Sequence, residues 1–282
     1  MKRRRFLHAT CALAAGAVQA SEPKKPQVRF GACDWTLRLT TNPDSLDLAR
    51  RIGLDGVQVD FGSEPSAEGW LPLFDEGLQD TLLQRAADTG VAIPSLAMGV
   101  LNKHGLKNSD DALRWTLEGV KVARRMNMPV VLLAFFGNGD LRNDEAGTQA
   151  VIAALKRLAA LAADAGITYG IESWLKVDAL ERILDAVKSP AIQVYYDVGN
   201  MQKEGEDYPA AIRRLGRERI CETHAKDYTD LYGRGSTDFV KVRDALGDIG
   251  YQGWMHIEGV KIPNGIEEDI GYDLRYLRSI FG

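Results

Sequence analysis

Apolar runs of strand length alternate with amphipathic stretches of helix length along most of the chain. The runs are rich in Val, Ile, Phe and Tyr, as buried strands are, and each is followed by a stretch with helical periodicity. We therefore predict eight strands, over residues 28–33, 56–61, 91–98, 129–136, 167–173, 192–197, 220–226 and 253–258.

The stretches between these strands carry the signals of helix boundaries. Residues 45–53 and 78–90 each end at a glycine, as helix C-termini often do, and residues 143–166 are rich in Ala and Leu. Residues 109–127 begin Ser-Asp-Asp, which suits N-terminal capping. Further helices are predicted over residues 177–187, 208–216, 238–250 and 265–281.

Eight strand–helix units in succession predict a single-domain (β/α)8 TIM barrel, a fold of about 250 residues. The alternative is a doubly wound open sheet, which usually has fewer strands and, when it binds nucleotides, a glycine-rich turn after its first strand. Here the first strand runs into CDWTLR, with no such turn. No low-complexity linker divides the chain, so the barrel domain is expected over residues 28–282.

The first residues have the pattern of an export signal. A basic start precedes an apolar stretch over residues 9–18, and small residues end at Ala20. The run RRRFL at residues 3–7 resembles the twin-arginine consensus, and the apolar stretch is shorter than the roughly 20 residues that span a membrane. The sequence predicts a signal peptide over residues 1–20, a polar leader over residues 21–27, and a periplasmic or otherwise exported protein.

Composition narrows the range of partners. The net charge of −4, without a basic bias, argues against a nucleic-acid surface. No later segment is long and apolar enough to cross a membrane, so the processed protein is expected to be free of the membrane. Cys11 falls in the signal, which leaves Cys33 and Cys221, and we interpret both as buried thiols. The sequence leaves open whether the protein forms a homo-oligomer.

Four consecutive predicted strands end on side chains that can bind a metal, namely Glu172, Asp197, His224 and Glu258. In a barrel the C-terminal strand ends surround the active site, and alternation lets one side chain per strand point into the mouth. Three carboxylates so close would repel one another and raise their pKa values, and a divalent cation removes that conflict. Mixed oxygen and nitrogen ligands suit Mn²⁺, Co²⁺, Zn²⁺ or Mg²⁺.

Each of these residues has a simpler interpretation when it is taken alone. A single Glu or Asp at a strand end is more often a helix cap or a loop contact. A single His is more often a polar residue with satisfied hydrogen bonds. The hypothesis of a metal site depends on four such residues standing in phase on consecutive strands.

The segments GIES, YYDVGN, HAKD, GRGSTDF and HIEG, in this order, resemble the xylose isomerase-like barrel family of sugar phosphate isomerases and epimerases. The resemblance covers essentially the whole chain after the signal. It implies one divalent metal ion held by Glu172, Asp197, His224 and Glu258. Mn²⁺ is the preferred candidate, and Mg²⁺, Co²⁺ and Zn²⁺ are the alternatives. The resemblance also implies that Glu172 and Glu258 move protons on opposite faces of a keto-sugar.

The expected chemistry suits these residue types. A metal bound to a carbonyl and the neighbouring hydroxyl stabilises the enediolate that forms when the carbon between them loses its proton. Two carboxylates can return that proton on the opposite face, which epimerises the sugar, or on the adjacent carbon, which isomerises it. Expulsion of a β-hydroxyl or β-alkoxy group gives elimination, so a lyase or dehydratase on a keto-sugar or keto-glycoside is the second hypothesis.

Several other residues are candidates for substrate contacts. Lys226 should share the face of His224, and His256 should share that of Glu258. Lys226 also matches the family's KD motif. Arg234 falls in the loop where the resemblance implies a basic substrate contact, although an ordinary solvated charge is an equal alternative.

Two tryptophans and one asparagine complete the set of candidates. Trp35 and Trp174 follow strands and either stack on a sugar face or pack in the interior. Three residues after the metal Asp, the epimerases have a histidine that touches substrate, and this chain has Asn200. Asn exchanges hydrogen bonds but does not take a proton near neutral pH. Asn200 is therefore a candidate substrate-binding residue, and the sequence leaves open both its contact with the substrate and the transfer of the family's substrate and reaction to this chain.

The leading hypothesis is therefore a periplasmic, metal-dependent carbohydrate isomerase or epimerase. Export favours an unphosphorylated or oxidised sugar, because sugar phosphates are mostly cytoplasmic. A binding protein whose barrel has lost catalysis is a third hypothesis, against which the intact Glu172 and Glu258 argue. Apurinic-site endonucleases, a related barrel class, use a histidine-rich trinuclear zinc site, for which His104, His224 and His256 are too few.

Overall fold

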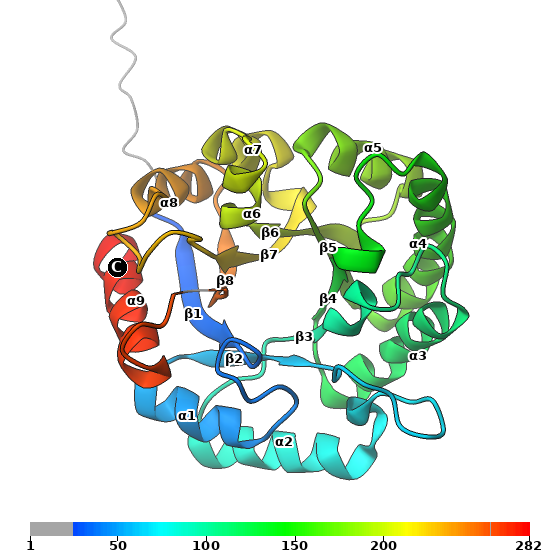
Figure 1. The fold of residues 1–282 in the computed structure, drawn as a ribbon, viewed down its shortest axis with the longest axis horizontal. Helices are drawn as coiled ribbons and strands as arrows, with labels where there is room; N and C mark the ends of the chain where they lie inside the picture. The colour runs from blue at the N-terminus through cyan, green and yellow to red at the C-terminus, as the bar shows by residue number, and fades with distance from the viewer. Residues whose placement is uncertain (1–24, 260) are drawn as a thin grey trace, which may run out of the picture.

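The computed structural model describes residues 25–259 and 261–282. Eight parallel strands close into a barrel in sequence order, and β1 pairs with β8 (Figure 1). The predicted TIM barrel is therefore confirmed. The strands are β1 (Gln27–Cys33), β2 (Gly56–Asp60), β3 (Ser95–Met98), β4 (Val130–Phe135), β5 (Thr168–Ser173), β6 (Ile192–Asp197), β7 (Ile220–Ala225) and β8 (Gln252–Ile257).

Helices form an outer ring around the strands (Figure 1) and return the chain so that successive strands run parallel. The α-helices are α1 (Asp44–Ile52), α2 (Glu76–Thr89), α3 (Asp110–Met126), α4 (Glu145–Ala165), α5 (Val177–Val187), α6 (Val198–Lys203), α7 (Tyr208–Leu215), α8 (Phe239–Asp248) and α9 (Ile266–Phe281). Short 3-10 helices lie in the connections: η1 (Pro72–Phe74), η2 (Gly99–Asn102), η3 (Gly137–Gly139) and η4 (Arg217–Arg219).

The predicted helix boundaries have the expected physical causes. Ser109 caps α3, since its Oγ accepts a hydrogen bond from the Ala112 amide at 3.2 Å. The same helix ends at Asn127, which adopts the left-handed conformation with φ of 57°. The glycines predicted to end α1, α2 and α4 also have positive φ angles. Local sequence signals therefore determine where these helices start and stop.

The barrel interior is apolar on one side and polar on the other. A small apolar cluster inside it comes mainly from β3 and β4, and consists of Ala97, Val130, Leu132, Ala134 and Tyr195. The strands β5, β7 and β8 instead place buried polar side chains there, namely Glu172, Glu222, His224 and His256, and β2 and β3 add Gln58 and Ser95. The large apolar core lies between the strands and the helices. Buried polar groups are costly unless they are paired, so the polar half of the interior needs a dense network of contacts.

Two elements differ from the prediction. β3 begins at Ser95 rather than at residue 91, because Pro94 has no amide hydrogen for the ladder. Residues 198–203, for which no helix was predicted, form α6, and Gly199 lies in this helix. A side chain at Gly199 would place its Cβ 2.8 Å from the carbonyl oxygen of Lys226, and this close approach explains the glycine.

Other sequence-based expectations concern the chain termini and the cysteines. The predicted signal peptide, residues 1–20, lies outside the described residues, and β1 begins at Gln27, the last residue of the predicted leader. Both remaining cysteines are free thiols; Cys33 is buried, and Cys221 is only partly buried. Within residues 25–259 and 261–282, no helix combines the length and the apolar character that a membrane span requires.

A pair of Gly-to-Ala substitutions tests the packing of the barrel interior. In Gly31→Ala the new Cβ would lie 2.5 Å from His256 Cδ2 and 2.8 Å from the Gly56 carbonyl oxygen. We expect this variant to lose about 1–3 kcal/mol of unfolding free energy through overpacking. In Gly271→Ala, within α9, the Cβ meets only the flexible guanidinium of Arg275 at 3.3 Å. This control should gain up to about 1 kcal/mol from helix propensity. Denaturant unfolding measures the free energy of unfolding of both variants. Equal changes in the two variants would contradict the packing described around Gly31.

Candidate metal and active site

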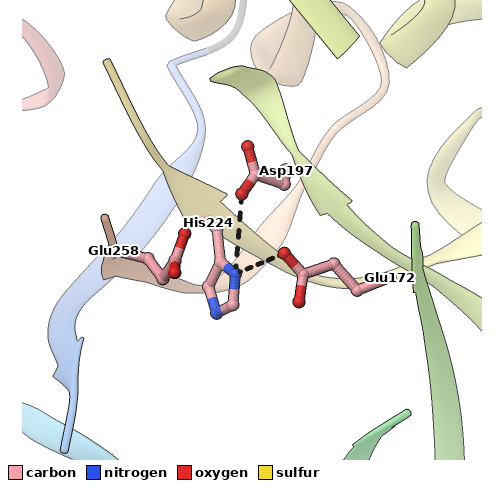
Figure 2. A group of neighbouring side chains, drawn as sticks. All are labelled: Glu172, Asp197, His224 and Glu258. Carbon is pink, nitrogen blue, oxygen red and sulfur yellow. Dashed lines mark hydrogen bonds and ion pairs between the residues drawn. The ribbon is translucent and has the colours of Figure 1, made fainter. Parts of the chain in front are cut away.

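The four strand-end residues meet at the C-terminal mouth of the barrel. Glu172 comes from β5, Asp197 from β6 and His224 from β7, and Glu258 directly follows β8. Each offers one ligand atom, and these atoms all lie within 4.8 Å of one another. Figure 2 shows the three carboxylates arranged around the imidazole of His224. The first three side chains are buried and the fourth is partly buried.

Strand register places these side chains. In the parallel ladder, Asp197 stands opposite His224, and His224 stands opposite His256 on β8. Because side chains alternate between the two faces of a strand, every second residue of β7 and β8 points into the barrel. A polar layer therefore forms at the mouth, and a second one forms beneath it.

Asp197 performs two tasks with its two oxygens. Its Oδ1 accepts a hydrogen bond from the Asn200 amide at 2.8 Å and so caps α6. Its Oδ2 is buried beside the other carboxylates and accepts no hydrogen bond. The helix-cap interpretation and the metal-ligand interpretation therefore describe different atoms of the same side chain.

His224 lies at the centre of the cluster. Its Nδ1 is 3.2 Å from Glu172 Oε1 and 3.9 Å from Asp197 Oδ2. Burial alone would lower the pKa of His224, but the neighbouring carboxylates, Glu172 foremost, outweigh burial and raise it. The imidazole thus lies in a strongly negative field.

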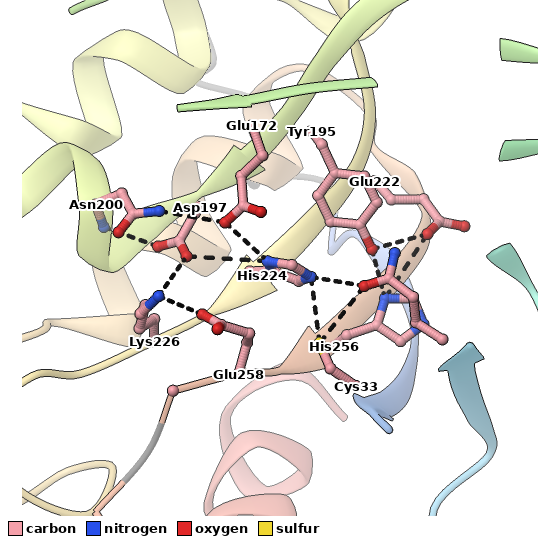
Figure 3. A network of polar contacts seen from close by, with 12 residues as sticks. Cys33, Glu172, Tyr195, Asp197, Asn200, Glu222, His224, Lys226, His256 and Glu258 are labelled. Atoms are coloured by element: carbon pink, nitrogen blue, oxygen red, sulfur yellow. Dashed lines mark hydrogen bonds and ion pairs between the residues drawn. The ribbon is translucent and has the colours of Figure 1, made fainter. Parts of the chain in front are cut away.

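Lys226, just after β7, is the cation within this field. Its Nζ lies 3.5 Å from Asp197 Oδ2 and forms an ion pair with Glu258 Oε2 (Figure 3). Burial would lower the pKa of Lys226, but Asp197 and Glu258 outweigh burial and raise it. The ammonium therefore compensates part of the negative charge of the cluster.

The carboxylates respond differently to this ammonium. Burial raises the pKa of Asp197 to about 7; Lys226 opposes the rise, while repulsion from Glu172 and Glu258 adds to it. For Glu258, burial favours the neutral acid, but Lys226 and His224 outweigh burial and lower the pKa. The pKa of Asp197 therefore shifts upward, mainly through burial and only in smaller part through repulsion, whereas the pKa of Glu258 shifts downward.

The cluster fits a divalent cation on its own chemistry. When all three carboxylates are ionised and the imidazole is neutral, as metal binding requires, three carboxylates and one ammonium leave two negative charges at the barrel mouth. Asp197 Oδ2 has no hydrogen-bond donor, and Glu258 Oε2 has only the ion pair with Lys226. Carboxylate oxygens together with one imidazole nitrogen are ligands that Mn²⁺, Zn²⁺ and related ions accept. These four residues could therefore hold one such ion.

A cavity of about 500 Å³ opens over the cluster, and most of the predicted site residues line it. They are Trp35, Glu172, Trp174, Asn200, Lys226 and Glu258. A larger hollow of about 740 Å³ lies elsewhere, over residues 64–76 and the facing side of α3, and contains none of them. The chemistry therefore belongs to the smaller cavity.

Side chains in this cavity hold the two glutamates in place. Trp35 Nε1 donates a hydrogen bond to Glu258 Oε1 at 3.2 Å. Asn200 Nδ2 donates to Glu172 Oε1 at 3.2 Å, and Asn200 Oδ1 accepts from the Tyr228 hydroxyl at 2.5 Å. Asn200 therefore connects Glu172 to a residue that the sequence analysis did not select.

Trp174 forms part of the cavity wall. It packs edge-on against Phe136, with ring centroids 5.0 Å apart, and the guanidinium of Arg142 lies over its ring. Both predicted tryptophans thus line the cavity and also pack against protein groups, so the two interpretations of them hold together.

Two predicted substrate residues do not line the cavity. Arg234 is exposed, and its guanidinium lies over the Tyr272 ring at 4.6 Å. His256 is fully buried in the layer beneath the cluster, where its Nδ1 lies 2.8 Å from the Tyr195 hydroxyl. Burial and the proximity of His224 lower the pKa of His256 well below its usual range. His256 does point into the barrel, as the alternation of side chains predicts. It lies deeper in the barrel than a substrate contact requires, and the sequence did not predict that depth.

Tyr228 and Gln58 are among the residues that contact the site and were not predicted. Tyr228 lines the cavity and directly follows the HAKD segment, so proximity to that motif was an available signal. Gln58 Oε1 lies 2.9 Å from His224 Nε2, beneath the cluster. A single amide in the otherwise apolar strand segment GVQV was the available signal for Gln58.

Comparison with known proteins identifies the relatives of this barrel. A family model described as xylose isomerase-like TIM barrel matches residues 46–280. A putative L-ribulose-5-phosphate 3-epimerase of Escherichia coli K12 is 26% identical over 244 residues, which cover 77% of this chain and 82% of that protein.

Solved structures show the same fold at lower identity. The D-psicose 3-epimerase of Clostridium cellulolyticum H10 aligns with a TM-score of 0.74 and 15% identity over 90% of this chain and 99% of that chain. The 3-keto-D-glucoside 4-epimerase of Escherichia coli also has a TM-score of 0.74, at 14% identity over 90% of this chain and 100% of that chain.

Proposed function

The chain belongs to the xylose isomerase-like TIM barrel family, and we propose that it is a carbohydrate isomerase or epimerase that depends on a divalent metal. The observation that carries this proposal is the position of Glu172 and Glu258. Both belong to the four-residue cluster and both line the cavity above it. The sugar epimerases among the relatives, which act on ketose phosphates, free ketoses or keto-glucosides according to their names, support the reaction class.

The proposed reaction removes one proton from a carbon of the sugar and returns one, and in an isomerisation the hydroxyl proton also moves to the former carbonyl oxygen. A divalent ion bound by Glu172, Asp197, His224 and Glu258 would supply Lewis acidity to the substrate carbonyl. One glutamate removes the proton from the carbon next to that carbonyl, and the other glutamate delivers a proton to the opposite face or to the adjacent carbon. Asn200 and His224 hold Glu172, while Trp35 and Lys226 hold Glu258, so the bases approach from opposite sides of the cluster.

Asn200, which stands where the family has a histidine, is compatible with proton transfer by the two glutamates alone. Asn200 donates to Glu172 and accepts from Tyr228, so its amide orients a base and needs no proton transfer of its own. The substrate group that meets this position is therefore expected to exchange hydrogen bonds with Asn200 or Tyr228 and to stay uncharged.

The cavity also bears on the kind of sugar. Among the described residues that line it, the two cations are already paired: Lys103 with Glu64, at 2.7 and 2.8 Å, and Lys226 with the cluster. Lys203 lies nearby, with its ammonium over the rings of Trp174 and Tyr228, but it does not line the cavity. Phosphate sites usually use free Arg or Lys donors or exposed helix N-termini. We infer a substrate without a phosphate group, which also suits the predicted export.

The first test follows solvent deuterium. The protein should be stripped of metal, restored with Mn²⁺, Mg²⁺ or Co²⁺, and incubated in D2O with a panel of keto-sugars and keto-glycosides under NMR. We expect deuterium at one carbon with the sugar skeleton kept. Glu172→Gln and Glu258→Gln, each at saturating metal, should slow exchange by about 10²- to 10⁴-fold, whereas Glu118→Gln, outside the cavity, should not. Loss of water or of the aglycone would indicate a lyase, and unchanged exchange in both variants would rule out catalysis by these glutamates.

The second test concerns the metal site. Asp197→Asn keeps an oxygen that can accept from the Asn200 amide, so α6 stays capped, but it removes the charge that faces the cluster. We expect at least a 10-fold loss of Mn²⁺ affinity, measured by calorimetry on metal-free protein, with little change in thermal unfolding without metal. Asp75→Asn alters another helix cap, that of α2, and is the control. Equal Mn²⁺ affinities of the two variants would exclude Asp197 as a ligand.

The third test concerns phosphate. The wild type should convert an unphosphorylated keto-sugar more efficiently than the phosphate ester of the same sugar. Glu64→Gln frees Lys103 at the cavity and should improve kcat/KM for the ester by roughly 2- to 5-fold, the size of an exposed ion pair. Glu118→Gln, which frees Lys121 elsewhere, should leave it unchanged. A wild type that prefers the ester would overturn the inference on phosphate and leave the isomerase proposal intact.

A further inference from the structure

A buried chain of hydrogen bonds leads from β7 across the barrel and back to the candidate metal histidine. It begins at Glu222, whose Oε2 lies 2.6 Å from Ser95 Oγ on β3. Ser95 Oγ lies 3.1 Å from Gln58 Nε2 on β2, and Gln58 Oε1 lies 2.9 Å from His224 Nε2. All four side chains are almost completely buried. Figure 3 shows Glu222 and His256 on the side of His224 opposite to Asn200 and Lys226.

The chemistry of each group determines the direction of these bonds. The Glu222 carboxylate only accepts, so the hydroxyl of Ser95 donates to it. The oxygen of Ser95 is then free to accept from the amide nitrogen of Gln58. This turns the amide oxygen of Gln58 toward His224, where it can only accept. With Glu222 ionised, this arrangement favours a proton on His224 Nε2; the Cys33 thiol, 3.3 Å from Nε2, is directed at the same Gln58 oxygen and competes for it only weakly at 3.5 Å.

A proton on Nε2 leaves the lone pair of the neutral imidazole on Nδ1. Nδ1 is the nitrogen that faces the cluster, 3.2 Å from Glu172 Oε1 and 3.9 Å from Asp197 Oδ2. A histidine binds a metal through its unprotonated nitrogen, and the partner of the other nitrogen selects which one that is. The tautomer that a metal needs at this position is the one that Gln58 favours.

A second branch from the same carboxylate gives His256 the opposite tautomer. The Tyr195 hydroxyl donates to Glu222 Oε2 at 2.9 Å, so its oxygen accepts from His256 Nδ1 at 2.8 Å. His256 Nε2 then has no proton and needs no acceptor, which agrees with its lack of any hydrogen-bond partner. The two branches share Glu222 but can be cut separately.

We propose that Gln58 is a positioning residue that, oriented by Glu222 through Ser95, fixes His224 with Nδ1 free for the metal. The inference rests on the metal site of the proposed function. It goes beyond that function by assigning a task in the site to a side chain from β2, on the far side of the barrel from the ligands. Gln58 touches neither the cavity nor the other three ligands and acts only through His224.

The test compares two substitutions, each of which removes one hydrogen bond from one branch. Gln58→Met keeps the length and volume of the side chain but removes the acceptor for His224 Nε2. In histidine ¹⁵N NMR of metal-free protein, wild-type His224 should keep a proton on Nε2, with Nδ1 the nitrogen that gains or loses a proton, and this variant should lose that preference. Its Mn²⁺ affinity, measured by calorimetry, should fall by about 10- to 100-fold.

Tyr195→Phe is the matched control. It removes the hydroxyl beside His256 but leaves the bonds among Glu222, Ser95 and Gln58. We expect a changed tautomer for His256, an unchanged tautomer for His224 and nearly unchanged Mn²⁺ affinity. If Gln58→Met does not fold, Ser95→Ala makes the same comparison, because the Gln58 amide then loses the partner that orients it.

The proposal is overturned if His224 keeps its Nε2 proton and its Mn²⁺ affinity in Gln58→Met or Ser95→Ala. It is also overturned if Tyr195→Phe weakens Mn²⁺ binding as much as the cut at Gln58 does. None of these measurements uses catalysis. A wild type that binds Mn²⁺ but exchanges no deuterium with any sugar would therefore refute the proposed function and leave the role of Gln58 standing.

Discussion

The repulsion between three carboxylates at one end of the barrel is the constraint on which the rest of the site depends. Ionised carboxylates taken out of water are costly, and placing three of them around one imidazole adds Coulomb repulsion. The protein offsets only part of this cost: Lys226 pairs with Glu258, and Asp197 accepts a backbone amide. The remaining two negative charges are what make a divalent cation the natural complement of the site.

The barrel supplies this concentration of charge through strand register. Asp197, His224 and His256 stand opposite one another on β6, β7 and β8. A slip of one residue in any of these strands would turn its polar side chains toward the outer apolar layer. The apolar half of the interior, built mainly from β3 and β4, forms the facing wall of the cavity. Fold and electrostatics are therefore inseparable here.

This dependence explains what could be read from the sequence. The eight strands are predicted by the local pattern of apolar residues, and the four candidate ligands are predicted by their position at strand ends. Both predictions need only a few neighbouring residues of the sequence. Helix limits such as Ser109 and Asn127 are equally local. Contacts across the barrel are not specified locally: the amide in GVQV marks Gln58 as unusual but not His224 as its partner, and nothing local indicates that Lys226 pairs with Glu258. Loop side chains are harder still, as the stacking of Arg234 on Tyr272 shows.

Asp197 shows why a local and a functional interpretation of one residue need not compete. A helix cap uses one carboxylate oxygen, and a metal needs only one, so an aspartate between a strand and a short helix can serve both. The cap also fixes the rotamer of the side chain, which keeps Oδ2 directed at the cluster. The same helix carries Asn200 one turn later, where it meets Glu172. Three residues of sequence thus connect Asp197, a candidate metal ligand, to the orientation of Glu172, and a substitution of the Asn200 side chain changes the surroundings of Glu172 while the backbone amide still donates to Asp197.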